Sequence, residues 1–184
     1  MGLGGYKIRN KEEIHFLSFA VVEWADVFSR QQFRDIIVKS LEHCQNEKGL
    51  RLHAWCIMSN HVHLLVSSID NDLSSIIRDF KKFTSYAIIK AIIDNPQESR
   101  KDWLIDLFKK AGQQNSRNAT YQFWRQDNHP KEVYSRRFTI NKLAYIHNNP
   151  DEAGIVEKPE HYLYSSARDY FMTQRVGLLK IDFI

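Results

Sequence analysis

The chain has 184 residues, a formal net charge of +4 and a pI near 9.0, and 43% of its residues are hydrophobic. This length and apolar content fit one domain with a substantial core, so we expect a single domain over residues 1–184. The two cysteines are too few for a disulfide framework and no apolar run is long enough for a membrane span, so we expect a cytoplasmic protein without a secretory leader or membrane anchor.

A lead-in, a strand and a helix are predicted first. Residues 1–13 are rich in glycine and then in charge, which indicates a loose segment. Residues 14–28 are rich in Phe, Val and Trp without a helical stripe, and they predict one long strand. Ser29 and Gln32 have the spacing of a capping box, and apolar residues recur at helical spacing up to Gly49. We therefore predict a helix between Ser29 and Gly49.

A hairpin and a second helix are predicted next. Residues 50–58 and 61–67 have the composition of two strands, and Ser59 and Asn60 between them indicate a tight turn. From residue 71 to residue 95, apolar side chains recur at helical spacing and leave a polar opposite face, which predicts a long helix.

His61 and His63 lie at the start of the second strand of this hairpin. Because side chains at i and i+2 point to the same face of a strand, the two imidazoles would stand side by side and could hold one metal ion. The pair alone is weak evidence, since a chain with 8 histidines often contains this spacing by chance. A metal site needs further groups from elsewhere in the chain.

A later segment supplies such groups. Residues 139–150 predict a short helix that begins at a Thr139 cap and ends at Pro150. Tyr145 and Asn149 are four residues apart, so they share one face of that helix. A phenol nucleophile and an amide oxygen could then approach the same ion. Together with the histidine pair, they indicate a metal-assisted phosphoryl-transfer site.

Positive charge gathers in the middle of the chain and leads up to the helix of Tyr145. The cations of this region that we expect to bind DNA are Arg78, Lys81, Lys82, Arg136 and Arg137. Acidic residues group elsewhere, and a basic stretch beside a candidate active site favours a DNA or RNA partner over a merely solvated surface.

The remaining segments complete the predicted fold. Residues 97–120 are polar and predict only a short helix around residues 103–108, residues 132–135 predict a late strand, and residues 165–171 predict one turn of helix. The resulting order is typical of an α+β fold in which an antiparallel sheet carries helices on one side, the ferredoxin-like split β-α-β arrangement. Such a sheet would display the histidine pair on its open face beneath a later helix.

Three segments carry a resemblance to a known family. A histidine, an apolar residue and a histidine on a strand, followed by a tyrosine on a later helix, resemble the HUH single-strand DNA transposases with one catalytic tyrosine. Residues 145–154, YIHNNPDEAG, are similar to the Tyr-Ile-x-x-Asn-Pro-x-x-Ala-Gly stretch of the REP-associated tyrosine transposases. Residues 59–66, SNHVHLLV, agree as well, and residues 162–167, YLYSSA, agree more weakly. The resemblance spans residues 14–171.

The resemblance implies an HUH endonuclease fold with His61, His63 and Asn149 as metal ligands and Tyr145 as the nucleophile. Histidine and amide ligands admit a divalent cofactor, Mg²⁺ or Mn²⁺, in an octahedral shell completed by DNA oxygen and water, and zinc, which usually prefers four ligands, stays an alternative. The resemblance also implies single-stranded or hairpin DNA as the partner. The reaction would cleave and rejoin DNA through a 5′-phosphotyrosine and a free 3′-hydroxyl. We further expect a homodimer, association with the nucleoid and no contact with membranes.

The chain departs from the family pattern at two places. Residues 92–120 are longer than is usual and are predicted to be an insertion that alters hairpin recognition or covers the site. Asp151 and Glu152 are acidic where such proteins often carry a basic residue, and the acids would weaken DNA contact there.

Two other classes of function stay open at this point. A metal-dependent phosphodiester hydrolase could use the histidine pair with Cys56 or an acid. A non-catalytic nucleic-acid-binding module would need only the basic surface. Tyr86, on the basic face of the long helix, is a rival nucleophile.

Overall fold

A four-stranded antiparallel sheet forms the centre of the computed structural model, in the order β2-β3-β1-β4. The strands are β1 (His15–Ala20), β2 (Leu50–Ile57), β3 (His61–Ser68) and β4 (Lys131–Glu132). Because β3 lies between β1 and β2 and is antiparallel to both, β1 and β2 run parallel and their connection is a split β-α-β unit. The predicted α+β class and strand arrangement are confirmed.

The structure describes residues 13–70, 72–114, 120–126, 131–133, 135–174 and 177–184. The predicted lead-in therefore lies outside the described residues except for Glu13.

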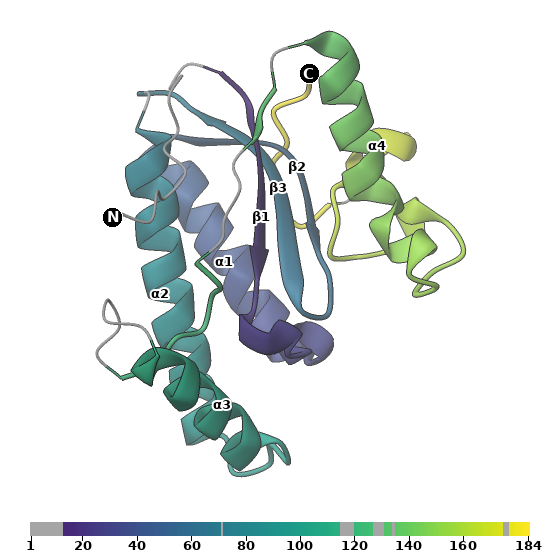
Figure 1. The fold of residues 1–184 in the computed structure, drawn as a ribbon. Helices are drawn as coiled ribbons and strands as arrows, with labels where there is room; N and C mark the ends of the chain where they lie inside the picture. The colour runs from purple at the N-terminus through teal and green to yellow at the C-terminus, as the bar shows by residue number, and fades with distance from the viewer. Residues whose placement is uncertain (1–12, 71, 115–119, 127–130, 134, 175–176) are drawn as a thin grey trace.

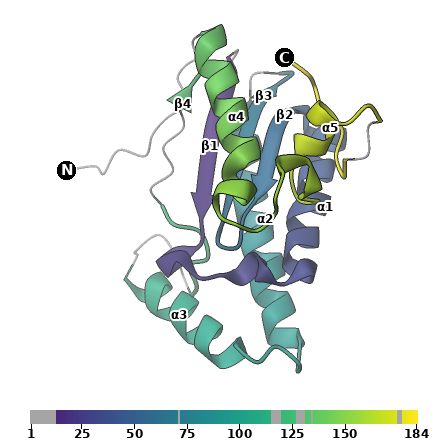
Figure 2. The same cartoon turned by 90° about the vertical axis from the view of Figure 1, so that its right-hand side faces the viewer.

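Helices cover both faces of the sheet. The long helices α1 (Gln31–Lys48) and α2 (Leu73–Asp94) lie together on one face, as Figure 1 shows. The helix α4 (Arg136–Glu152) crosses the other face, in front of β1, β3 and β2 in Figure 2. The face predicted to be open beneath a later helix is the one that α4 covers. None of the helices in the described part of the chain is both long and apolar enough to span a membrane.

The two faces of the sheet differ in chemistry. On the side of α1 and α2, Phe19 of β1 contacts Phe80 of α2, and its neighbours Val62 and Leu64 on β3 are fully buried. Because side chains alternate along a strand, His61 and His63 point to the side of α4. The first face is apolar, and the second carries the histidine pair beside apolar residues such as Phe16 and Leu65.

The first strand is shorter than predicted. β1 ends at Ala20, and two short 3-10 helices follow, η1 (Val22–Trp24) and η2 (Val27–Ser29). Ala20 is the last partner of β3, which begins at His61, and Val21 then donates to the carbonyl of Asn60 in the turn, where this ladder ends. Glu23 and Trp24 then adopt φ angles of 52° and 53°, in the left-handed region that residues other than glycine rarely occupy.

The helix α1 begins later than predicted and ends where expected. Ser29 does not cap it, because the Ser29 hydroxyl donates to the Asp26 carbonyl at 2.7 Å. At the other end, Gly49 has a φ of 68°, the left-handed conformation that commonly ends a helix.

The helix α4 is longer than predicted at both ends. Ser135, rather than Thr139, is its cap, and the Ser135 hydroxyl accepts a hydrogen bond from the Phe138 N–H at 3.2 Å. The helix continues through Pro150 to Glu152, because a proline in the last turn removes only one backbone hydrogen bond. Asn149 is therefore an internal helix residue.

The predicted insertion contains the end of α2 and a helix, α3 (Lys101–Gln113), which is longer than the short helix expected there. Leu104 and Phe108 on one face of α3 are fully buried. The short helix α5 (Ala167–Phe171) agrees with the predicted late turn of helix.

Residues 162–167 fix the position of α4 over the sheet. Ile57 donates a backbone hydrogen bond to Tyr164, and Ser166 donates one to Trp55, so this segment runs along the free edge of β2. The Ser166 hydroxyl also lies 2.8 Å from Nε2 of His147, a buried residue of α4. The weakest of the three family-like segments thus holds the helix that carries Tyr145.

Candidate active site

The histidine pair stands on the face of the sheet beneath α4. The ring centroids of His61 and His63 are 4.6 Å apart. Nδ1 of His61 lies 2.7 Å from the side-chain oxygen of Asn60, so Nε2 is left for another partner. His63 is only 3% exposed, and within the described residues neither of its ring nitrogens has a hydrogen-bond partner. A buried polar group without a partner is rare and suggests that a ligand completes it.

Both imidazoles are held in their neutral form. Burial is the largest cause that lowers the pKa of His63, and together with the electrostatic effects of His61 and Lys142 it brings that pKa to about 3. Burial also lowers the pKa of His61, although a hydrogen bond with Asn149 acts in the opposite direction. A neutral imidazole has the free lone pair that a metal ion requires.

Tyr145 and Asn149 of α4 reach the same place. The Tyr145 ring lies 5.2 Å from the His63 ring, and 43% of the residue is exposed to solvent. Nδ2 of Asn149 donates to the Tyr145 carbonyl at 3.1 Å, which leaves its carboxamide oxygen for His61 or a cation. The structure therefore brings together all four residues predicted for the site.

Two neighbours were not singled out by the sequence patterns. Phe16 of β1 packs against both the His63 ring, at 5.5 Å, and the Tyr145 ring, at 5.9 Å. Nζ of Lys142 lies 5.0 Å from the centre of the Tyr145 ring. Lys142 precedes Tyr145 by three residues, so the helical spacing rule that pairs Tyr145 with Asn149 could have found it.

The donor set could hold a divalent cation. Two neutral imidazole nitrogens and one amide oxygen would leave the other coordination positions to water and substrate oxygens. No three His, Cys, Asp or Glu side chains gather into a metal-binding group in the described ranges. Asn149, which hydrogen-bonds His61, offers an amide oxygen beside the histidine pair.

The predicted DNA-binding cations separate into two sets. Arg136 and Arg137 are exposed in the first turn of α4, on the side of the candidate site. The other three, Arg78, Lys81 and Lys82, lie on α2, which covers the opposite face of the sheet. The helices α2 and α4 lie on opposite faces of the sheet, so these cations start from two sides of it.

The residues that the alternative hypotheses require, Cys56 for a hydrolase and Tyr86 as a rival nucleophile, are poorly placed. Cys56 is fully buried, and burial raises the pKa of its thiol well above the usual range, which disfavours a thiolate nucleophile. Tyr86 is 67% exposed on α2, away from the histidine pair.

Comparisons with known proteins agree with this geometry. The chain matches the family model described as "Transposase IS200 like" over residues 13–110. A solved structure described as "Structure of the REP associates tyrosine transposase bound to a REP hairpin" matches with a TM-score of 0.61 at 17% identity. That match covers 99% of this chain and 92% of that chain, and it establishes the fold. No curated protein sequence matches. On the family match, the chain belongs to the IS200-like transposases, enzymes that cleave DNA strands and transfer them.

Proposed function

We propose that this transposase cleaves and rejoins single-stranded DNA through a covalent bond to Tyr145. The observation that carries the proposal is the convergence of His61, His63, Tyr145 and Asn149 from β3 and α4. The family match ends at residue 110, before Tyr145, so the roles of the α4 residues rest on this geometry.

In the proposed reaction, the Tyr145 oxygen attacks the scissile phosphorus and a new oxygen–phosphorus bond forms. The bond from phosphorus to the 3′ oxygen breaks, and that oxygen leaves as a hydroxyl with the proton that the phenol gives up, directly or through water. The DNA on the 3′ side of the break stays attached through its 5′ phosphate, as a 5′-phosphotyrosine. Attack by another 3′-hydroxyl reverses these steps, so rejoining needs no ATP.

The residues around the tyrosine have separate tasks. His61, His63 and Asn149 would hold a divalent cation, which supplies charge neutralisation and orientation at the scissile phosphate. Phe16 packs on the edge of the Tyr145 ring and limits its movement. Lys142 places a positive charge beside that ring, where the phosphate must approach.

The substrate proposed is DNA with hairpin-forming repeats. The solved structure of similar fold is described as bound to a REP hairpin, which supports the same class of DNA here. Arg136 and Arg137, exposed at the start of α4, are proposed to contact its phosphates. Each phosphate contact should contribute about 0.7–0.9 to the slope of log affinity against log salt, and glutamine at either position should remove that share.

The direct test is a search for the covalent intermediate. Labelled hairpin DNA with single-stranded flanks is incubated with the protein and Mn²⁺, and denaturing gels report a protein–DNA adduct. We expect the adduct in the wild type, its complete loss in Tyr145→Phe, and its retention in Tyr170→Phe. Tyr170 is a matched control because it is also a tyrosine, but its hydroxyl donates to the His53 carbonyl of β2 and is not part of the candidate site.

Three results would contradict the proposal. An adduct that mass spectrometry maps to Tyr86 would make that residue the nucleophile. Cleavage without an adduct would indicate a hydrolase, and binding without cleavage would indicate a non-catalytic module.

The dependence on metal is tested separately. Removal of divalent ions with a chelator should abolish the adduct, and separate addition of Mg²⁺ and Mn²⁺ should restore it.

The homodimer and the association with the nucleoid stay predictions. Light scattering of the purified protein with and without hairpin DNA checks the first, and imaging of a fluorescent fusion in cells checks the second.

A further inference from the structure

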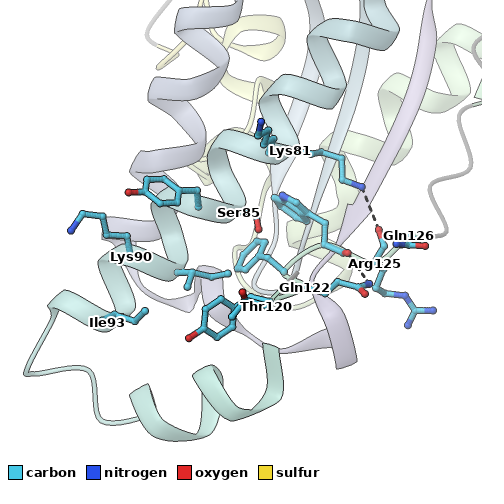
Figure 3. A pocket seen from close by; sticks show the side chains of 14 residues that line it. Lys81, Ser85, Lys90, Ile93, Thr120, Gln122, Arg125 and Gln126 are labelled. Carbon is cyan, nitrogen blue, oxygen red and sulfur yellow. Dashed lines mark hydrogen bonds between the residues drawn. The ribbon is translucent and has the colours of Figure 1, made fainter. Parts of the chain in front are cut away.

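A pocket of about 730 Å³ lies between α2 and residues 120–126. Figure 3 shows Lys81, Ser85 and Lys90 along one wall and Thr120 and Gln122 along the other. Its volume falls within the range of sites that hold small organic ligands. Since α2 covers the face of the sheet opposite α4, this pocket is separate from the histidine pair.

The lining of the pocket is basic. Its fourteen residues include no Asp or Glu and four cations: Lys81, Lys82, Lys90 and Arg125. Lys90 forms an ion pair with Asp94 just outside the lining, and Lys82 is exposed on the rim. The charge of the pocket therefore complements an anion.

The lining is also aromatic. Tyr86 is 67% exposed and Tyr121 is half-buried, while Phe123 and Trp124 are buried beneath them. Exposed rings beside lysines match the way proteins bind single-stranded nucleic acid, in which unpaired bases stack on aromatic side chains and cations contact the phosphates. A duplex would offer the pocket only its backbone.

The pocket is connected to the candidate active site by two side chains. Arg125 belongs to the lining, and in Figure 3 its guanidinium points away from α2. That guanidinium lies 5.3 Å from the centre of the Trp24 ring, and the Trp24 ring lies 5.9 Å from the His61 ring. Trp24 is 52% exposed, and Nδ2 of Asn60 donates to its carbonyl at 3.2 Å. A strand leaving His61 would thus meet an exposed indole, then a cation, then the pocket.

We propose that the pocket between α2 and residues 120–126 binds unpaired nucleotides of the DNA strand that flanks the scissile phosphate, with Trp24 and Arg125 guiding the strand from the active site. This inference rests on the proposed function for the identity of the strand. The path passes the end of β1, where the backbone N–H of Arg125 donates to the Ala20 carbonyl.

The test compares two double variants that each lose one ring and one charge. Tyr86→Ala with Lys82→Gln changes the pocket. Phe83→Ala with Lys39→Gln is the matched control, because Phe83 is 59% exposed, Lys39 is exposed, and both line a different pocket, between α1 and α2. Both are made in the full chain with Tyr145→Phe, so that binding is measured without cleavage. Thermal unfolding checks that each variant folds.

Fluorescence anisotropy is measured with three probes: a bare hairpin, the same hairpin with an oligothymidine flank on its 5′ or 3′ side, and oligothymidine alone. The pocket variant should raise the Kd for one flanked hairpin and for oligothymidine by about 10-fold or more, and leave the bare hairpin unchanged. The control variant should bind all probes like the parent. Loss of Lys82 should also reduce the salt slope on flanked DNA by about 0.7.

The proposal is overturned if the pocket variant binds every flanked probe like the control, or if it loses equal affinity for bare and flanked hairpins. Its failure can be told apart from failure of the proposed function. Without any phosphotyrosine adduct, a selective loss of oligothymidine binding would still support the pocket. With an adduct but no selective loss, the active site would stand and the pocket proposal would fall.

Discussion

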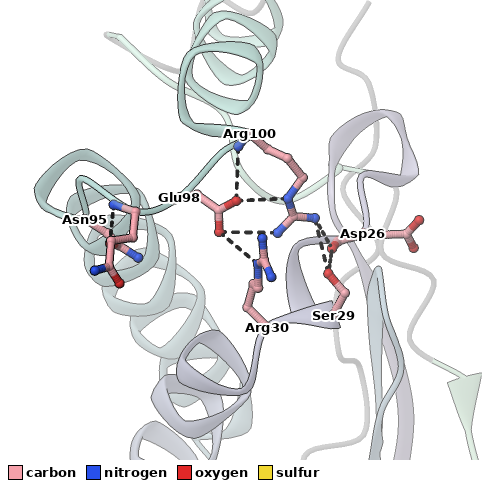
Figure 4. Close-up of polar contacts among 7 residues, drawn as sticks. Asp26, Ser29, Arg30, Asn95, Glu98 and Arg100 are labelled. Carbon is pink, nitrogen blue, oxygen red and sulfur yellow. Dashed lines mark hydrogen bonds and ion pairs between the residues drawn. The ribbon is translucent and has the colours of Figure 1, made fainter.

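Two buried polar groups in this protein have opposite hydrogen-bonding states. The side chain of Glu98, in the link between α2 and α3, is 1% exposed and accepts bonds from both Arg30 and Arg100, as Figure 4 shows. His63 is similarly buried, yet within the described part of the chain its ring nitrogens have no partner. Burial alone therefore does not mark a functional group. A buried polar group that the fold leaves unpaired does, because folding gains nothing that offsets its loss of water.

The Glu98 cluster has a structural purpose. Nε of Arg100 donates to Glu98 at 3.0 Å, and its Nη1 donates to the Asp26 carbonyl at 2.9 Å, so the cluster joins the start of α3 to η2. Asp26 in turn accepts from the Ser59 hydroxyl at 2.6 Å, in the turn that precedes His61. The paired cluster supports the hairpin from which the unpaired histidine projects.

The sharpest test of this contrast is His63→Leu. Adduct formation should fall by more than about 100-fold, because ligand loss costs at least as much as loss of a residue that orients a ligand. The free energy of unfolding in urea should stay the same or rise by up to about 1–3 kcal/mol, because leucine removes an unpaired buried group. A clear fall in stability would show that His63 has a structural role.

His147→Leu is the matched control for that experiment. His147 is also a buried imidazole with a pKa lowered by burial, to about 4, but its Nε2 lies 2.8 Å from the Ser166 hydroxyl. Its replacement should lower the free energy of unfolding by about 1–3 kcal/mol, since it leaves a buried hydroxyl with one partner fewer.

The second prediction breaks the paired cluster. Glu98→Ala should lower the free energy of unfolding by about 1–3 kcal/mol. The loss is no larger because the side chains of Arg30 and Arg100 are 49% and 26% exposed, so water replaces part of the lost pairing. The folded fraction should still form the adduct with hairpin DNA. Asp79→Ala is the control, and it should cost much less because the Asp79 side chain is 37% exposed in its pairs with Lys48 and Arg78.

If Glu98→Ala and Asp79→Ala lowered the free energy of unfolding equally, the buried pairing of Glu98 would stabilise the protein no more than an exposed ion pair does. A loss of adduct in the folded Glu98→Ala protein would mean that the cluster acts on the active site through η2 and the Ser59 turn.

The convergence of the four candidate residues could be predicted from sequence, because each pair depends on a local period. Alternation along a strand puts His61 and His63 on one face, and the helical spacing of four does the same for Tyr145 and Asn149. Neither spacing depends on where the strand or helix begins or ends. The predicted start of α4, later than the observed one, therefore did not change which residues share a face. The turn at Ser59 and Asn60 was predicted from equally local chemistry.

Features that depend on contacts between distant segments were not predicted. The end of β1 at Ala20 is set by where β3 begins, and no property of residues 14–28 shows it. The separation of the α2 cations from those of α4 depends on which face each helix covers. Residues 162–167 hold α4 in place through backbone bonds to β2, which sequence patterns do not reveal. The partners of Glu98 likewise come from segments far from it in sequence.

The third and smallest effect concerns acid. The hydrogen bond from Arg100 lowers the pKa of Glu98 from its ordinary value of 4.5, although burial opposes this. A carboxyl with a lowered folded-state pKa contributes stability that is complete above its unfolded-state pKa and is lost as pH falls through the folded-state value. Below about pH 4.5, the free energy of unfolding of the wild type should therefore fall more steeply than that of Glu98→Gln. Urea titrations of both proteins between about pH 3 and 7 measure the two slopes. The buried histidines titrate alike in both proteins, so the difference between the curves isolates Glu98, and parallel curves would mean that its pairing does not depend on charge.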